Sequence, residues 1–97
     1  MREQVRAAIV NLFLDLGLKR IMLRDEETFT NGKTYFRIVC LTTYKTFIIE
    51  IAHSFEEAEK YMFNDSDQYH ISDGIETIIK KIRADMLKVF ADEEEYK

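Results

Sequence analysis

The chain has 97 residues, of which 46% are hydrophobic, and a formal net charge of −4 at pH 7. This length corresponds to one domain, and this apolar content is enough for a core, which argues against a disordered chain. The mild acidity argues against nucleic acid as a generic partner. A lone cysteine, Cys40, excludes an internal disulfide and fits a reducing cytoplasm.

An amphipathic helix is expected over residues 2–16, because apolar residues recur there every three or four positions. Gly17 is expected to end this helix, since glycine enters the left-handed conformation of a helix C-terminus at little cost. Leu18 is then expected to fold back onto Phe13 in a Schellman motif. Polar residues interrupt the apolar run, so neither a signal peptide nor a membrane span is expected.

A short strand is expected over residues 19–24, where apolar and basic side chains alternate. Residues 25–32 are expected to form a loop that ends in the turn dipeptide Asn31-Gly32. A tight turn at this dipeptide would place acidic side chains on the apolar face of the next strand. We therefore expect a longer or bulged connection, with Phe29 covering part of the core, and the register of the first strand stays open.

Two antiparallel strands are expected over residues 34–41 and 46–51, and the residues themselves indicate the register. Pairs whose numbers sum to 87 place apolar side chains on one face and Arg37 opposite Glu50 on the other. A shift of one residue would move Glu50 onto the apolar face, so this register and a four-residue connection are predicted. The apolar pairs are Phe36–Ile51, Ile38–Ile49 and Cys40–Phe47.

Two more helices are expected in the second half of the chain. Ser54 and Glu57 form a capping box that begins a short helix reaching about Phe63, and a polar, acidic connection follows. Asp73 is expected to cap a long C-terminal helix. Residues 92–97 are expected to fray, because four acidic residues there oppose the helix dipole. The apolar stripe of the long helix comprises Ile75, Ile78, Ile79, Ile82, Met86, Val89 and Phe90.

Together these elements predict one α+β domain spanning residues 1–97. We expect a two-layer sandwich with an N-terminal helix, an antiparallel sheet of two or three strands, a short helix and a long C-terminal helix. The chain contains no internal repeat and no low-complexity segment.

No catalytic, cofactor or metal site is expected. Residues 65–70 carry aspartates at alternate positions, as calcium loops do, but Tyr69 and His70 stand where such a loop needs a further Asp or Asn and a glycine. The two histidines, His53 and His70, lack the spacing of a zinc site. We therefore expect a protein that is not an enzyme, and keep an enzyme as a third alternative.

The main functional prediction is a small cytoplasmic protein that acts by binding another protein, as an inhibitor, immunity protein or regulator does. Its carboxylates would engage a basic partner, and the half-apolar outer face of the sheet could contact a partner or a second copy. The candidate binding residues are Asp65, Asp67, Tyr69 and His70, in a polar segment held between two helices. No membrane association is expected.

The alternative prediction is a small nucleic-acid-associated regulator. It depends on two local basic clusters, although such residues on a helix usually form a solvated face. These clusters comprise Lys19 and Arg20 in the first half and Lys80, Lys81 and Arg83 in the second.

Overall fold

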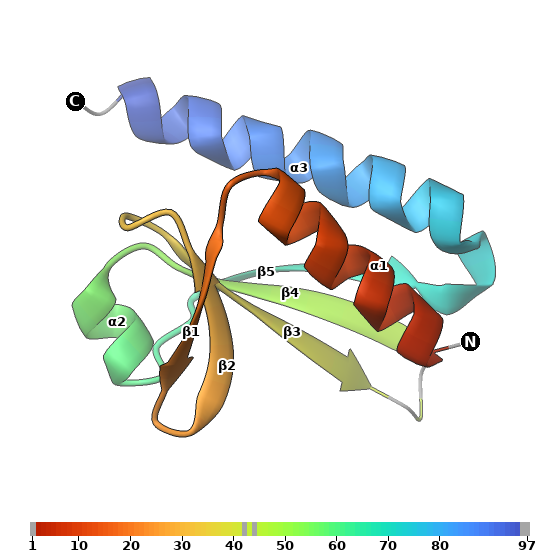
Figure 1. The fold of residues 1–97 in the computed structure, drawn as a ribbon, viewed down its shortest axis with the longest axis horizontal. Coiled ribbons are helices and arrows are strands. Elements are labelled where there is room, and N and C mark those ends of the chain that lie inside the picture. The colour runs from red at the N-terminus through yellow and green to blue at the C-terminus, as the bar shows by residue number, and fades with distance from the viewer. Residues whose placement is uncertain (1, 42, 44, 96–97) are drawn as a thin grey trace.

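The chain forms an α+β fold in which an N-terminal helix and a long C-terminal helix pack on an antiparallel sheet of five strands (Figure 1). The computed structural model describes residues 2–41, 43 and 45–95. The elements are α1 (Arg2–Asp15), β1 (Lys19–Leu23), β2 (Glu26–Thr30), β3 (Tyr35–Leu41), β4 (Thr46–Ala52), α2 (Phe55–Glu59), β5 (Asp65–His70), the 3-10 turn η2 (Ile71–Asp73) and α3 (Ile75–Glu95).

The sheet is a meander in the order β1-β2-β3-β4-β5. The expected sheet of two or three strands was therefore too small, because β2 lies in the predicted loop and β5 in the predicted acidic connection. Both segments are rich in acidic and hydroxyl side chains and lack a repeated apolar alternation. These segments are strands because their backbones pair with β1, β3 and β4. The polarity of the side chains does not predict such backbone pairing.

The predicted register of the two central strands is confirmed. β3 and β4 pair with Phe36 opposite Ile51, and Arg37 lies opposite Glu50. The longer connection expected before β3 is also confirmed, because Phe29 pairs with Phe36 and residues 31–34 form the turn. This register keeps the phenylalanines together on the face that the two long helices cover, called here the helix face.

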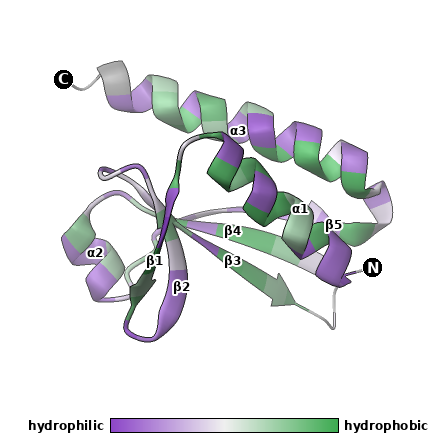
Figure 2. Ribbon diagram, viewed as in Figure 1, coloured by the Kyte–Doolittle hydropathy of each residue, from purple (hydrophilic) through white to green (hydrophobic). Residues whose placement is uncertain are grey.

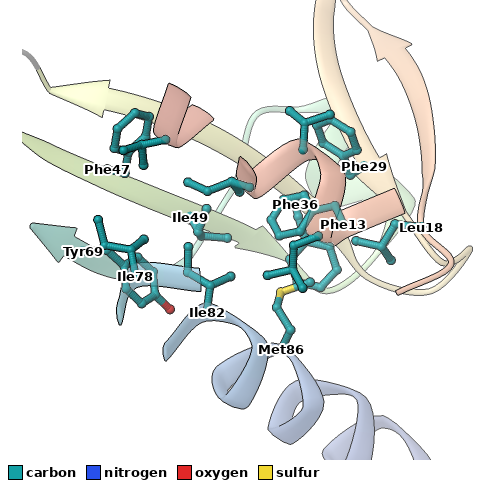
Figure 3. Packing of buried hydrophobic residues seen from close by; sticks show 14 of the residues in the cluster. Phe13, Leu18, Phe29, Phe36, Phe47, Ile49, Tyr69, Ile78, Ile82 and Met86 are labelled. Atoms are coloured by element: carbon teal, nitrogen blue, oxygen red, sulfur yellow. The ribbon is translucent and has the colours of Figure 1, made fainter. Parts of the chain in front are cut away.

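The helix face carries the main hydrophobic core. Phe29, Phe36 and Phe47 of the sheet lie under α1 and α3, and the ring centroids of Phe13 and Phe29 are 5.3 Å apart. Figure 3 shows Ile78, Ile82 and Met86 of α3 pointing toward these side chains, as the predicted stripe requires. Figure 2 shows the corresponding pattern along the ribbon, with hydrophobic residues concentrated in β3 and β4 and alternating with polar ones in α3.

The end of α1 has the predicted Schellman geometry. Gly17 has φ +87°, and its amide donates to the Leu14 carbonyl at 3.0 Å, while the Leu18 amide donates to the Phe13 carbonyl at 3.1 Å. These two bonds satisfy carbonyls that the helix itself leaves open. The buried Leu18 then directs the chain into β1, along the edge of the sheet.

On the opposite face of the sheet, called here the outer face, α2 covers one end. The predicted cap is confirmed, because the Glu57 amide donates to Ser54 Oγ at 3.1 Å. The helix ends at Glu59, earlier than the expected Phe63, and Tyr61 adopts φ +58°. A small second core lies beneath α2, formed by Tyr35, Ala52 and Ala58.

The long helix differs from expectation at both ends. Asp73 belongs to the 3-10 turn before the helix rather than to its cap, and its carboxylate lies 3.3 Å from Lys81 Nζ. At the other end α3 includes residues as far as Glu95. Fraying of residues 92–97 stays a prediction, although Glu93 accepts hydrogen bonds from Asn31 and Thr34. No helix in the described part of the chain has the length and apolar content needed to cross a bilayer.

Candidate functional site

The polar segment singled out in the sequence forms the edge strand β5 rather than a loop between helices. Its side chains alternate between the two faces of the sheet. Asp67 lies opposite Ile49 of β4 and Tyr69 opposite Phe47, so Asp65, Asp67 and Tyr69 share the helix face. The remaining candidate, His70, pairs with Thr46 and lies on the outer face.

Tyr69 belongs to the core and ties β5 to α3. Its side chain is only 5% exposed, and its hydroxyl donates to Asp85 Oδ2 at 2.6 Å. Burial raises the pKa of the Tyr69 hydroxyl well above its ordinary value, and the hydrogen bond to Asp85 and the negative charge there raise it further. Tyr69 thus stays protonated and keeps donating, which makes it a positioning residue for the strand.

His70 is separated from the two aspartates by the sheet itself. Its Nδ1 lies 3.5 Å from Thr46 Oγ1 on the outer face. Because Tyr69 is buried in the core and His70 lies on the other face, only Asp65 and Asp67 are accessible together among the four predicted binding residues.

These two aspartates line a cleft between β5 and the C-terminal half of α3. The cleft has a volume of about 380 Å³. Carboxylates line it from both sides, those of the strand and those of the helix, and two aliphatic side chains contribute apolar surface. We call this the acidic cleft; its residues are Asp65, Asp67, Asp92 and Glu93, with Ile51, Val89, Ser66 and His53.

Among the residues that line the acidic cleft, His53 is the one with a positively ionisable side chain. His53 follows the end of β4, and its Nε2 lies in contact with Asp65 Oδ2. Both side chains are at least half exposed to solvent. This pair therefore lies in the lining of the cleft and is accessible to solvent.

The Asp67 carboxyl in this cleft has a raised pKa. Partial burial raises the pKa of this carboxyl above its ordinary value of 3.8, and the charges of Asp85 and Asp65 raise it further, whereas Lys88 lowers it. Burial is the largest cause of this shift, and the contributions of Asp85 and Asp65 show that other carboxylates lie close to Asp67. The chemistry that this site suits is the binding of a cation.

Sequence reasoning missed the contribution of α3 to this site. Asp92 and Glu93 were assigned to a fraying tail, and His53 was considered as a zinc ligand. A signal was present, because Glu93 follows Met86 and Val89 at helical spacing and so falls on the face that looks toward the sheet. Only the fold shows that β5 lies beneath that face.

The outer face offers a second, weaker surface. Val39 and Ile48 are half-buried and Leu41 is exposed at the end that α2 leaves uncovered. Arg37 on the same face is engaged by Glu26 at 3.0 Å and by Glu50 at 3.4 Å. This strip is a small apolar surface.

The basic clusters lie on different elements, β1 and α3, and two of their members already have acidic partners. Arg20 lies 3.5 Å from Glu27, and Lys81 lies 3.3 Å from Asp73. These contacts reduce the positive charge that either cluster presents to a phosphate backbone. The nucleic-acid alternative stays a prediction.

Within the described residues, no group of three or more histidine, cysteine or acidic side chains has an arrangement that could hold a metal ion. Comparison with known proteins gave no match among protein families, curated proteins or solved structures.

Proposed function

We propose that this protein acts by binding a partner protein, and that the acidic cleft receives lysine or arginine side chains of that partner. The observation that carries this proposal is the cleft itself, about 380 Å³ in volume, in which β5 and α3 both place carboxylates. A cationic group entering it would meet carboxylates on two sides, and the negative field would also attract a basic partner at a distance.

The apolar part of the cleft supports the same ligand class. Ile51 and Val89 contribute aliphatic surface beside the carboxylates. Lysine and arginine have long aliphatic stems that pack against such surface while the charged head reaches polar groups. A bare metal cation would gain nothing from this surface.

A short tetralysine peptide carrying a fluorescent label is a suitable probe for a partner that is not yet identified. Binding is measured by fluorescence anisotropy over a range of salt concentrations. We expect Asp65→Asn with Asp67→Asn to weaken binding by about tenfold or more at low salt, because about 1 kcal/mol is lost with each exposed charge pair. The difference should shrink as salt rises.

The matched control is a double variant with the same change in net charge, placed on α2 instead of at the cleft. Glu56→Gln with Glu59→Gln removes two exposed carboxylates of α2, which covers one end of the outer face. This control should bind like the parent protein, and both double variants should keep the parent melting temperature within a few degrees. An equal loss of binding in both variants would show that only net charge matters, and the cleft would then have no special role.

A further inference from the structure

The outer edge of β5 carries backbone groups that no other strand uses. β5 is the last strand of the sheet, and no strand in the described part of the chain pairs with its far side. The amide of Ile71 donates to the Lys45 carbonyl at 2.9 Å and so extends the β4–β5 ladder by one pair. Because hydrogen-bonded pairs alternate in an antiparallel ladder, the amides and carbonyls of Ser66 and Gln68 point away from β4.

We propose that the partner binds as a sixth strand along this edge, in an extended segment with cationic side chains at alternate positions. The proposal rests on the proposed function and specifies how the cationic groups arrive. The outward backbone groups of Ser66 and Gln68 would pair with the added strand, as in other cases of strand addition. Affinity would then come from the backbone, and selectivity from the side chains facing the acidic cleft.

The spacing of the cations follows from the geometry of β5. Asp65 and Asp67 both face the cleft, two residues apart, while the Ser66 side chain lies on the other face. Side chains two residues apart on any strand are roughly 7 Å apart and on the same side. A segment with Lys-x-Lys or Arg-x-Arg spacing would therefore place both charges over the two aspartates. Adjacent lysines would send one charge to the outer face.

The negative charges beside β5 disfavour the pairing of this edge with the β5 edge of a second copy of the chain. Two β5 edges paired about a two-fold axis perpendicular to the sheet would keep their helix faces on the same side. Asp65 and Asp67 of both copies would then gather on that side, next to Asp92. Charged side chains on an edge are a common protection against pairing of identical edges. The same charges favour a basic strand from another protein.

The first test leaves the protein unchanged and compares two peptides of identical composition. One peptide is acetyl-Thr-Lys-Thr-Lys-Thr-amide and the other acetyl-Thr-Thr-Lys-Lys-Thr-amide, with binding followed by NMR titration. We expect the alternating peptide to bind at least about fivefold more tightly, since only it places both charges in the cleft while its backbone pairs with β5. Equal affinities would overturn strand addition and leave the acidic cleft as a site for point charges.

The second test changes the edge. Gln68→Pro removes one outward N–H while the bonds from β5 to β4 stay in place, and Gln68→Ala keeps the N–H and serves as the control. We expect the proline variant to lose the preference for the alternating peptide, with the alanine variant unchanged.

The outcomes separate the two proposals. Loss of binding in Asp65→Asn with Asp67→Asn, together with equal peptide affinities, would support the cleft and overturn the sixth strand. Absence of binding by either peptide would overturn both proposals. A concentration-dependent dimer of the parent protein, seen by sedimentation and abolished by Gln68→Pro, would assign the edge to a second copy instead.

Discussion

Single residues in unusual backbone conformations shape one end of the molecule. The turn between β1 and β2 consists of Arg24 and Asp25, both with positive φ, at 50° and 65°. A two-residue hairpin turn of this kind favours asparagine and glycine, so neither residue suggests it. Tyr61 stabilises the turn, because its hydroxyl donates to the Arg24 carbonyl at 2.9 Å and its ring lies 4.7 Å beneath the Arg24 guanidinium.

Asp67 provides a pH-dependent prediction at the same scale. Because its pKa is raised above 3.8 in the folded protein, the folded state holds this proton more tightly than the unfolded chain does. As pH rises through the interval between 3.8 and the raised pKa, the unfolded chain releases its proton first, and the folded state loses stability. Asp67→Asn removes this loss, so it should be slightly more stable than the parent at neutral pH.

Urea denaturation of the parent and of Asp67→Asn at several pH values checks this prediction. The advantage of the variant should disappear well below pH 3.8, where the carboxyl is protonated in both states. Glu56→Gln, on α2, is a suitable control at an exposed carboxylate away from the cleft. A variant less stable than the parent at neutral pH would mean that the Asp67 carboxylate is a net stabilising group.

At the scale of elements, α3 joins the core to the site. Its inward face packs on the sheet through Ile78, Ile82 and Met86. The same face carries Val89 and Glu93, about one and about two turns after Met86, to the acidic cleft. The packing of the N-terminal half of α3 on the sheet therefore positions the residues that its C-terminal half contributes to the cleft. A change that loosens α3 should affect binding and stability together.

Ile82 and Leu87 allow a matched test of this packing, since the two side chains have the same number of carbon atoms. Ile82 is fully buried, whereas Leu87 is 51% exposed. Ile82→Ala should lower the free energy of unfolding by about 2–4 kcal/mol, because it removes buried methyl groups and leaves a cavity. Leu87→Ala should change it by less than about 0.5 kcal/mol. Similar losses in urea denaturation would show that α3 packs on a different face.

At the scale of the whole molecule, the C-terminal part of α3 is fastened to the turn before β3. Asn31 Nδ2 donates to Glu93 Oε2 at 2.9 Å, and Thr34 Oγ1 donates to the other oxygen of the same carboxylate. Thr34 is only 2% exposed. These contacts join segments 59 and 62 residues apart along the chain and bring the last turns of α3 over the sheet.

Removing the buried hydroxyl tests this connection. Thr34→Val keeps the shape of the side chain and removes the donor to Glu93, so it should lower the free energy of unfolding by about 1–2 kcal/mol. The amides of the last turn of α3 should also exchange faster with solvent. Thr77→Val, at an exposed position of α3, should do neither. If residues 92–95 fray in solution, Thr34→Val will leave amide exchange in this turn unchanged.

The sequence by itself determined the parts of the fold whose apolar residues recur with a clear period. The register of β3 with β4, the end of α1 at Gly17 and the inward face of α3 all followed from local pattern, and the structure agrees. These patterns determine the structure because a shifted strand register or a rotated helix would expose apolar side chains and bury charged ones.

Only the tertiary structure decided where the polar segments go. β2 and β5 are strands because neighbouring strands supply their hydrogen-bond partners. This backbone pairing depends little on the type of side chain. The acidic cleft likewise joins residues from β4, β5 and α3 that are far apart in the chain. The periodicity of a local segment does not indicate which distant segments come into contact, because the packing of whole helices and strands determines those contacts.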